Sequence, residues 1–350
     1  METLSLGKTK MVVSKLGFGG IPIQRLTENA AVAVVRKCLD LGITFLDTAN
    51  GYTTSEERIG KAIKGRRDGL ILATKSGART REEVSKHLKL SLKRLGTDHI
   101  DLYQFHNVST FDHLDKVLDP NGPMDVVEEA KKEGVIRHIG ITSHSMDVAK
   151  KAVESDYFET IMFPFNFITS EPADQLLPLA REHDVGFIVM KPLAGGMLSN
   201  AAIAFKYLFQ FPDIISIPGI EQIEEIEEIV HILAGPWEMT EPQKQEMQQL
   251  KEELGTKFCR RCDYCQPCSE EIPISMVMNA RSFFKRLPAD RFFSGMVDDT
   301  MEKAANCTKC GECETRCPYH LPIIDTIAEN TPWYQAKKRE FQAQITTKST

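Results

Sequence analysis

The sequence predicts an α/β protein in which a (β/α)8, or TIM, barrel is followed by a small helical domain rich in cysteine. Short strand-like runs alternate with helix-period segments from residue 15 to about residue 233, as in successive βαβ units. Eight of the nine cysteines then fall in two short runs between residues 259 and 317. A chain of 350 residues is long enough for one large domain and one small one.

Eight strand-like runs match the size of a closed barrel better than that of an open doubly wound sheet. No G-x-G-x-x-G run follows the first strand, because Gly17-Phe18-Gly19-Gly20 lacks that spacing. The expected strands are 15–19, 44–47, 70–74, 100–105, 136–141, 160–163, 186–190 and 214–217. The segments between the strands are expected to be helices, for example 28–41, 56–64, 81–95, 124–132, 146–154, 173–183 and 222–233.

Segments on both sides of the barrel complete the predicted order. Residues 4–13 alternate around a turn and predict a short hairpin that plugs the N-terminal end of the barrel. Residues 241–254 predict a charged amphipathic helix that ends at Gly255. We therefore expect a barrel domain over 1–254, a cysteine domain over 255–330, and a polar tail over 331–350 of the kind that is often disordered.

The composition excludes some classes of partner. The net charge is −6, and acids and bases are interspersed. The sequence therefore shows no basic region of the kind that binds nucleic acid or an anionic membrane. The sequence has no apolar run of ~18 residues, and its first residues lack the basic and apolar regions of a signal peptide. We expect a cytoplasmic protein, in which cysteines at two-residue spacing favour metal over disulfides.

Four polar residues stand at or just after the expected strand ends, where the reactive residues of such barrels lie: Asp47, Tyr52, Lys75 and His106. Taken singly, Asp47 could be a strand-end cap and His106 a half-buried histidine with satisfied hydrogen bonds. Taken together with the run Asp47-Thr-Ala-Asn-Gly-Tyr52-Thr-Thr-Ser55-Glu56, they resemble the aldo/keto reductase family. The resemblance runs from the N-terminal hairpin to about residue 233 and implies that the four residues are a catalytic tetrad.

The chemistry of carbonyl reduction agrees with these residue types. Hydride addition places negative charge on the substrate oxygen, and a tyrosine with a pKa near 10 is a weak acid unless its phenolate is stabilised. A lysine ammonium beside Tyr52 would stabilise the phenolate, and Asp47 would hold that ammonium. We therefore expect Tyr52 to be the general acid and His106 to be the donor that orients the substrate oxygen. Lys75 and Asp47 are expected to be the pair that lowers the pKa of Tyr52.

The resemblance also implies a nicotinamide dinucleotide, NAD(P)H, lying across the barrel mouth. Two features depart from the family pattern, because Met162 stands where a glutamine is common and Phe165 replaces the tyrosine of the Y-N motif. The implied cofactor-binding residues are Ser143, His144 and Asn166 for the carboxamide, Lys191, Pro192, Leu193, Gly195 and Gly196 for the pyrophosphate, and Pro218, Gly219 and Glu228 for the adenosine half.

The segment 219–228 is acidic where members that prefer NADP place a basic residue. Carboxylates repel a 2′-phosphate but accept hydrogen bonds from ribose hydroxyls, which favours NADH or weak discrimination. A second interpretation is that these glutamates form the first turn and solvated face of the last helix. The physiological substrate is not encoded in any motif of the loops, including 107–123.

The two cysteine runs carry the strongest chemical signal. The second run, Cys307, Cys310, Cys313 and Cys317 followed by proline, is the C-x2-C-x2-C-x3-C-P pattern that holds a [4Fe–4S] cube. The first run consists of Cys259, Cys262, Cys265 and Cys268 and has two residues rather than three before its fourth cysteine. The number of clusters, one or two, is therefore left open. A zinc interpretation also stays open, although cysteines in such close series suit tetrahedral zinc sites poorly.

The segment between the two runs has helical character, so the region resembles an alpha-helical ferredoxin with two [4Fe–4S] clusters. In two-cluster ferredoxins the fourth cysteine of each run joins the other cluster. This implies one cluster on Cys259, Cys262, Cys265 and Cys317, and one on Cys307, Cys310, Cys313 and Cys268. Cys38, on the apolar face of the first barrel helix, is expected to be a core residue.

Three functions follow as hypotheses. The first is an NAD(P)H-dependent oxidoreductase that reduces an aldehyde or ketone, or oxidises the alcohol. The second is an electron-transfer or partner-docking iron–sulfur protein whose barrel is a recognition module. Hydride transfer moves two electrons and a cluster moves one, so coupling them calls for a flavin or a redox partner protein, and no flavin fingerprint is visible. The third is that the clusters only stabilise their domain.

Overall fold

The structure, a computed structural model, describes residues 1–348. The chain divides into two compact units, the first from Met1 to Met247 and the second beginning at Gln248. The division falls within α11 (Glu241–Gly255), earlier than the boundary at 254 expected from the sequence. Each unit is described separately below.

Eight parallel strands form the sheet of the first unit, each paired with its neighbour in chain order. Two parallel bridges, Leu16 with Ser216 and Gly19 with Gly219, connect the first strand to the last, so the sheet closes on itself. The predicted (β/α)8 barrel is thereby confirmed. The strands are β3 (Phe18–Gly19), β4 (Phe45–Asp47), β5 (Ile71–Ser76), β6 (Ile100–Phe105), β7 (Ile136–Thr142), β8 (Thr160–Pro164), β9 (Gly186–Met190) and β10 (Ile214–Ser216).

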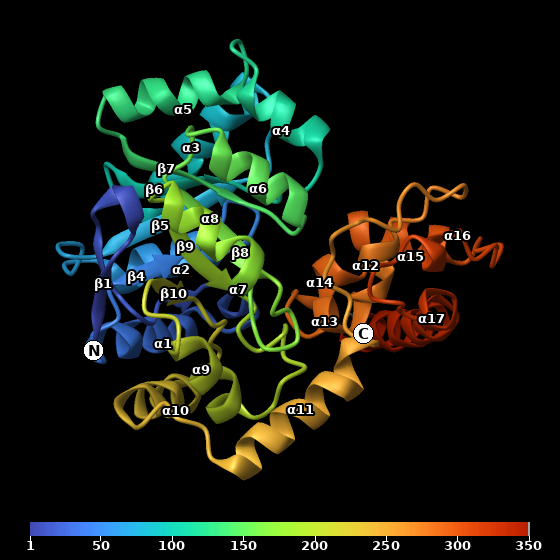
Figure 1. Ribbon diagram of the computed structural model, residues 1–350. Helices are drawn as coiled ribbons and strands as arrows, with labels where there is room; N and C mark the ends of the chain where they lie inside the picture. The colour runs from blue at the N-terminus through green and yellow to red at the C-terminus, as the bar shows by residue number, and fades with distance from the viewer. Residues whose placement is uncertain (349–350) are drawn as a thin grey trace. The chain divides into compact units, whose positions relative to one another are not determined.

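Helices surround this sheet and bury their apolar faces against it (Figure 1). α4 and α9 lie outside the ranges given as examples of expected helices. α4 has only eight residues, and α9 is apolar on nearly every face, so α9 shows no clear amphipathic period. The helices are α1 (Glu28–Asp40), α2 (Ser55–Ile63), α3 (Arg81–Leu95), α4 (Phe111–Leu118), α5 (Pro123–Lys132), α6 (Met146–Glu154), α7 (Pro172–Gln175), α8 (Leu177–Glu182), α9 (Ala201–Phe209) and α10 (Ile223–Ala234).

The predicted N-terminal hairpin consists of β1 (Thr3–Ser5) and β2 (Val12–Ser14). Its apolar side chains join those that fill the barrel interior, such as Phe45 and Leu102, in one buried cluster. Gly7 lies so close to the start of β9 that a Cβ there would be 2.3 Å from the nitrogen of Gly186. The hairpin therefore plugs the N-terminal end of the barrel and leaves the other end for chemistry.

The second unit is helical between Gln248 and Lys348, with no strand in that range. Its core combines apolar side chains with cysteines of both runs. None of the described helices, 1–348, is long and apolar enough to cross a membrane. Beyond α11, its helices are α12 (Ile274–Met278), α13 (Ala280–Phe284), α14 (Ala289–Phe292), α15 (Gly295–Ala304), α16 (Glu312–Thr315) and α17 (Ile323–Lys348).

The expected polar tail is not a separate segment, because residues 331–348 belong to α17. Tyr334 is fully buried and donates a hydrogen bond to Asp298 of α15 at 2.8 Å. Phe341 stacks on Phe293, with ring centroids 5.0 Å apart. These widely spaced aromatic anchors hold an otherwise polar helix, which is why hydrophobic periodicity did not reveal it.

Candidate active site and metal centres

The four predicted catalytic residues meet at the C-terminal end of the barrel. Asp47 ends β4, Lys75 is next to last in β5, His106 follows β6, and Tyr52 lies in the loop after β4. Lys75 donates a hydrogen bond from Nζ to Oδ2 of Asp47, and the same nitrogen is 5.2 Å from the ring centroid of Tyr52. The rings of Tyr52 and His106 meet edge-on, with centroids 5.8 Å apart.

The Lys75–Asp47 pair is shielded from water. Their side chains are 2% and 4% exposed, and Gln104 donates a hydrogen bond to the other carboxylate oxygen at 3.1 Å. Burial alone would lower the pKa of Lys75, but the charges of Asp47 and Tyr52 outweigh it and raise the pKa above its ordinary value. Lys75 therefore remains a cation beside the tyrosine ring at physiological pH.

Backbone hydrogen bonds fix the loop that carries Tyr52. The amide of Asn50 donates to the carbonyl of Lys75 at 2.9 Å, and Arg94 of α3 donates to the carbonyl of Asn50 at 3.1 Å. Arg94 also pairs with Glu56, a buried carboxylate that accepts a hydrogen bond from Thr74 at 2.7 Å. The sequence assigned no role to Glu56, although it closes the motif that begins at Asp47.

Arg79 is a second residue that the sequence did not single out. Its guanidinium donates to the carbonyls of Gly77 and Ala78 in its own loop, both at 3.0 Å. It also donates to the carbonyls of His106 at 2.7 Å and Asn107 at 3.1 Å. Arg79 therefore ties the loop after β5 to the loop after β6, and only its position four residues beyond Lys75 could have indicated this.

The residues predicted to hold a nicotinamide follow β7 and β8. Ser143 and His144 are buried directly after β7, where the amide of His144 donates to Oγ of Ser109 at 2.9 Å. The side-chain oxygen of Asn166 accepts from two amides of its own loop, and its nitrogen donates to the carbonyl of Lys191 at 3.0 Å. Asn166 thus joins the loops after β8 and β9, and retains one amide hydrogen for a ligand.

The loop predicted for the pyrophosphate follows β9. Lys191, Ala194, Gly195 and Gly196 all have positive φ, and a Cβ on Gly196 would meet nothing within 4 Å. Successive backbone amides in such conformations form concavities that bind anions. The neighbouring Pro218 and Gly219 follow β10, where the carbonyl of Pro218 accepts from the amide of Gly19 at 2.8 Å. The residues present at this end of the barrel therefore fit a dinucleotide.

The acidic segment before and within α10 has mixed surroundings. Glu225 completes a capping box by accepting from the amides of Glu221 and Gln222, and Glu227 pairs with Lys37 at 2.6 Å. These two glutamates support the structural interpretation of the segment. Glu221 lies 3.4 Å from Arg25, and Glu228 is exposed on the helix surface.

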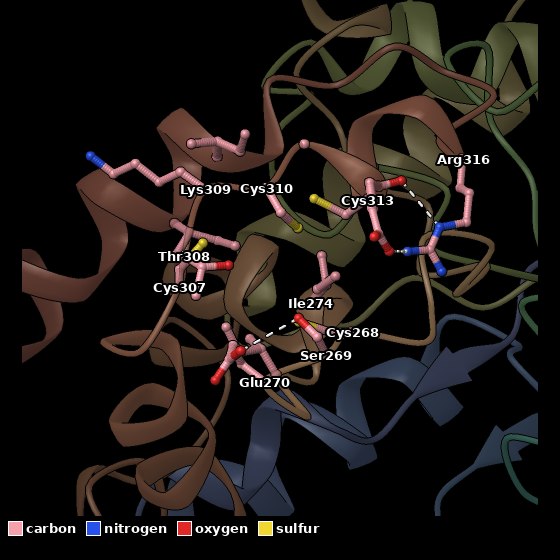
Figure 2. Close-up of a pocket in the computed structure, with 15 residues that line it drawn as sticks. Cys268, Ser269, Glu270, Ile274, Cys307, Thr308, Lys309, Cys310, Cys313 and Arg316 are labelled. Atoms are coloured by element: carbon pink, nitrogen blue, oxygen red, sulfur yellow. Dashed lines mark hydrogen bonds and ion pairs between the residues drawn. The ribbon is translucent and has the colours of Figure 1, made fainter.

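The eight clustered cysteines surround two hollows in the second unit. One hollow is lined by Cys268, Cys307, Cys310 and Cys313, all of which are labelled in Figure 2. The other is lined by Cys259, Cys262, Cys265 and Cys317. These are the two sets implied by the ferredoxin resemblance. The four cysteines that line each hollow fit a polynuclear cluster with four thiolate ligands.

The two hollows differ in exposure and share one wall. Ile274 lines both of them. Cys265 and Cys317 of one hollow are buried, whereas Cys310 of the other is exposed. Within residues 1–348, no group of three His, Cys, Asp or Glu side chains is arranged to hold a single metal ion. The ninth cysteine, Cys38, lies in the barrel core, where burial raises the pKa of its thiol to about 12.

Comparisons with known proteins agree with this two-part organisation. Residues 15–203 match the Aldo/keto reductase family, and residues 258–322 match the 4Fe-4S dicluster domain. An uncharacterized oxidoreductase of Bacillus subtilis, YqkF, is 34% identical over 57% of this chain and 67% of that protein. The aldo-keto reductase YhdN of the same organism is 32% identical over 61% and 68%.

A solved structure gives the same result for the fold. The aldo-keto reductase AKR11C1 from Bacillus halodurans, in its holo form, superposes with a TM-score of 0.63 at 29% identity. The superposition covers 71% of this chain and 96% of that one. This chain therefore belongs to the aldo/keto reductase family of oxidoreductases and carries a 4Fe-4S dicluster domain at its C-terminal end.

Proposed function

We propose that the barrel reduces an aldehyde or ketone with NAD(P)H, or oxidises the corresponding alcohol. The observation that carries this proposal is the position of Tyr52 between the buried Lys75–Asp47 pair and His106 at the open end of the barrel. An acid, a cation that stabilises its conjugate base, and a hydrogen-bond donor are the groups that carbonyl reduction requires.

Each residue of the tetrad has one task in this proposal. The Tyr52 hydroxyl gives its proton to the carbonyl oxygen, and the Lys75 ammonium stabilises the phenolate that remains. Asp47, which accepts a hydrogen bond from Gln104, holds Lys75 in place. His106 donates to the substrate oxygen and orients the carbonyl. A bound nicotinamide would supply the hydride.

The loops after β7 to β10 would hold the cofactor. Ser143, His144 and Asn166 suit the carboxamide, and the positive-φ loop from Lys191 to Gly196 suits the pyrophosphate. The adenosine half would reach Pro218, Gly219 and Glu228. Since Glu225 and Glu227 have structural partners and Glu221 pairs with Arg25, Glu224 and Glu228 are the glutamates of this segment left to disfavour a 2′-phosphate, and we propose weak discrimination between NADH and NADPH.

For the second unit we propose two [4Fe–4S] clusters, with Cys317 completing the first run and Cys268 the second. The four-cysteine lining of each hollow supports this count. It also supports the second candidate function, electron transfer, because the exposed Cys310 would bring one cluster to the surface. Exchange between one-electron clusters and a two-electron hydride donor would need a flavin or a redox partner protein.

One experiment separates the candidate functions. Anaerobically purified protein is mixed with NADH or NADPH carrying deuterium at the transferable position, together with a panel of aldehydes and ketones. Carbonyl reduction predicts deuterium on the carbinol carbon of at least one product. Bleaching of the cluster absorbance by NADH or NADPH without any carbonyl, and no labelled alcohol, would support electron transfer and contradict the reductase.

A further inference from the structure

Asn107 lies directly after His106 and is held from two sides. Its amide donates to Oγ1 of Thr142, the last residue of β7, at 2.8 Å. Its carbonyl accepts from Arg79, which lies in the loop after β5. Its φ is 54°, in the left-handed region that asparagine enters more readily than most residues. The backbone of Asn107 therefore spans the ends of three adjacent strands.

The Asn107 side chain points to the predicted cofactor residue His144. Oδ1 of Asn107 is 3.1 Å from Nδ1 of His144 and 3.3 Å from Oγ of Ser109. The Ser109 oxygen already accepts from the backbone amide of His144, so its own proton is available to Oδ1. An amide oxygen accepts and cannot donate. The proton in the Asn107–His144 hydrogen bond must therefore sit on Nδ1 of His144.

This assignment fixes what the other ring nitrogen can do. A neutral imidazole carries one N–H, so an Nδ1–H form leaves Nε2 as a hydrogen-bond acceptor. We propose that Asn107 locks His144 in the Nδ1–H tautomer, so that Nε2 accepts a hydrogen bond from the carboxamide N–H of the nicotinamide. The proposed hydrogen bond to the nicotinamide rests on the proposed function, whereas the Nδ1–H tautomer of His144 rests on the geometry alone.

Asn107 would then be a positioning residue for both halves of the reaction. It is the chain neighbour of His106, which orients the substrate, and the hydrogen-bond partner of His144, which orients the cofactor. Glycine could adopt the same φ but would offer no acceptor. Aspartate would offer an acceptor, but its charge would favour an imidazolium with two donors and no acceptor. Only an uncharged acceptor on a residue that tolerates positive φ meets both conditions.

The tautomer is measured directly by ¹⁵N NMR of histidine-labelled protein, with the His144 signals assigned by their loss in His144→Gln. The wild type should show the Nδ1–H pattern at neutral pH. Asn107→Gly should shift His144 toward the Nε2–H form, while the matched variant Asp156→Gly, at another positive-φ position, should not. An Nε2–H pattern in the wild type, or an unchanged tautomer in Asn107→Gly, would overturn the proposal that Asn107 holds His144 in the Nδ1–H tautomer.

Affinity for NADH and NADPH, measured by fluorescence titration, tests the proposed hydrogen bond between His144 and the nicotinamide. Asn107→Gly and Asn107→Asp should each weaken binding about tenfold, the size of one lost hydrogen bond, while Asp156→Gly binds like the wild type. Unchanged affinity in Asn107→Gly, beside normal wild-type binding, would overturn this inference alone. A wild type that binds neither nucleotide would overturn the proposed function together with the proposed hydrogen bond between His144 and the nicotinamide.

Discussion

Lys75 on β5 and Asp47 on β4 form an ion pair whose two side chains are almost completely removed from water. The barrel fold does not require a buried ion pair here. Burying charged side chains lowers stability unless they are paired and hydrogen-bonded. The pair lies 5.2 Å from the ring of Tyr52, measured from the lysine nitrogen to the centroid. Its position is explained best by its effect on that tyrosine.

Replacement of Tyr52 by phenylalanine should remove the proton donor and leave the ring in place. We expect kcat for carbonyl reduction to fall by about 10²- to 10⁴-fold, the usual contribution of general acid catalysis, with the dissociation constant of the nicotinamide cofactor unchanged. The matched control is Tyr157→Phe, since Tyr157 is exposed. Equal turnover by Tyr52→Phe and the wild type would refute the assignment.

Removal of one partner from the buried pair should destabilise the first unit. Lys75→Met leaves a buried carboxylate unpaired, so we expect the free energy of unfolding to fall by about 3–5 kcal/mol. Asp213→Asn, which breaks a half-exposed pair with Arg181, should cost no more than about 1 kcal/mol. Anaerobic urea unfolding followed by circular dichroism measures both, and Asp47→Asn replaces Lys75→Met if that variant does not fold. Similar losses in the buried-pair and surface-pair variants would contradict this prediction.

The same pair predicts the pH dependence of stability. Because the pKa of Lys75 is raised in the folded protein, its stabilising contribution is fully present below the ordinary lysine value of 10.5. The contribution is lost only as pH rises through the raised value. The difference in unfolding free energy between the wild type and the double variant Asp47→Asn/Lys75→Met, in which neither position titrates, should therefore be the same at pH 7 and pH 9. A marked decrease at pH 9 would show that Lys75 has already lost its proton.

Pairs of cysteine substitutions test how the clusters are held. If Cys317 shares a hollow with Cys259, the double variant Cys259→Ser/Cys317→Ser should lose one cluster and retain about four irons per chain. The double variant Cys259→Ser/Cys268→Ser should lose both clusters, because these cysteines line different hollows. Iron analysis and electron paramagnetic resonance of anaerobically purified protein distinguish the outcomes. Clusters built from consecutive cysteines would give the opposite result.

Iron removal should affect the two units differently. Cysteines of both runs belong to the core of the second unit, so chelation should leave that core with unfilled hollows and expose α12 to α17 to proteolysis. The barrel core contains Cys38 alone among the cysteines, and it should remain resistant. Limited proteolysis before and after chelation, with fragments identified by mass, measures this. Equal protection of both units in the iron-free protein would show that the clusters do not stabilise their domain.

The barrel and its tetrad could be predicted from the sequence because their signals are local. Strand and helix periods repeat along the chain, and the motif from Asp47 to Glu56 places chemistry at a strand end without any knowledge of the fold. The spacing of the cysteines likewise indicates iron–sulfur ligands. Two segments carry little local signal: α9, which is apolar on nearly every face, and the end of α17, which depends on distant aromatic contacts.

Contacts between residues far apart in the chain were decided only by the tertiary structure. Spacing alone cannot show that Cys317 faces the same hollow as Cys259, because closing that loop requires the helices between them to fold. Arg79 and Asn107 carry no motif, and their importance comes from hydrogen bonds that cross from one strand end to the next. The sequence by itself determined which groups are available for the reaction, and the fold determined how those groups are held relative to one another.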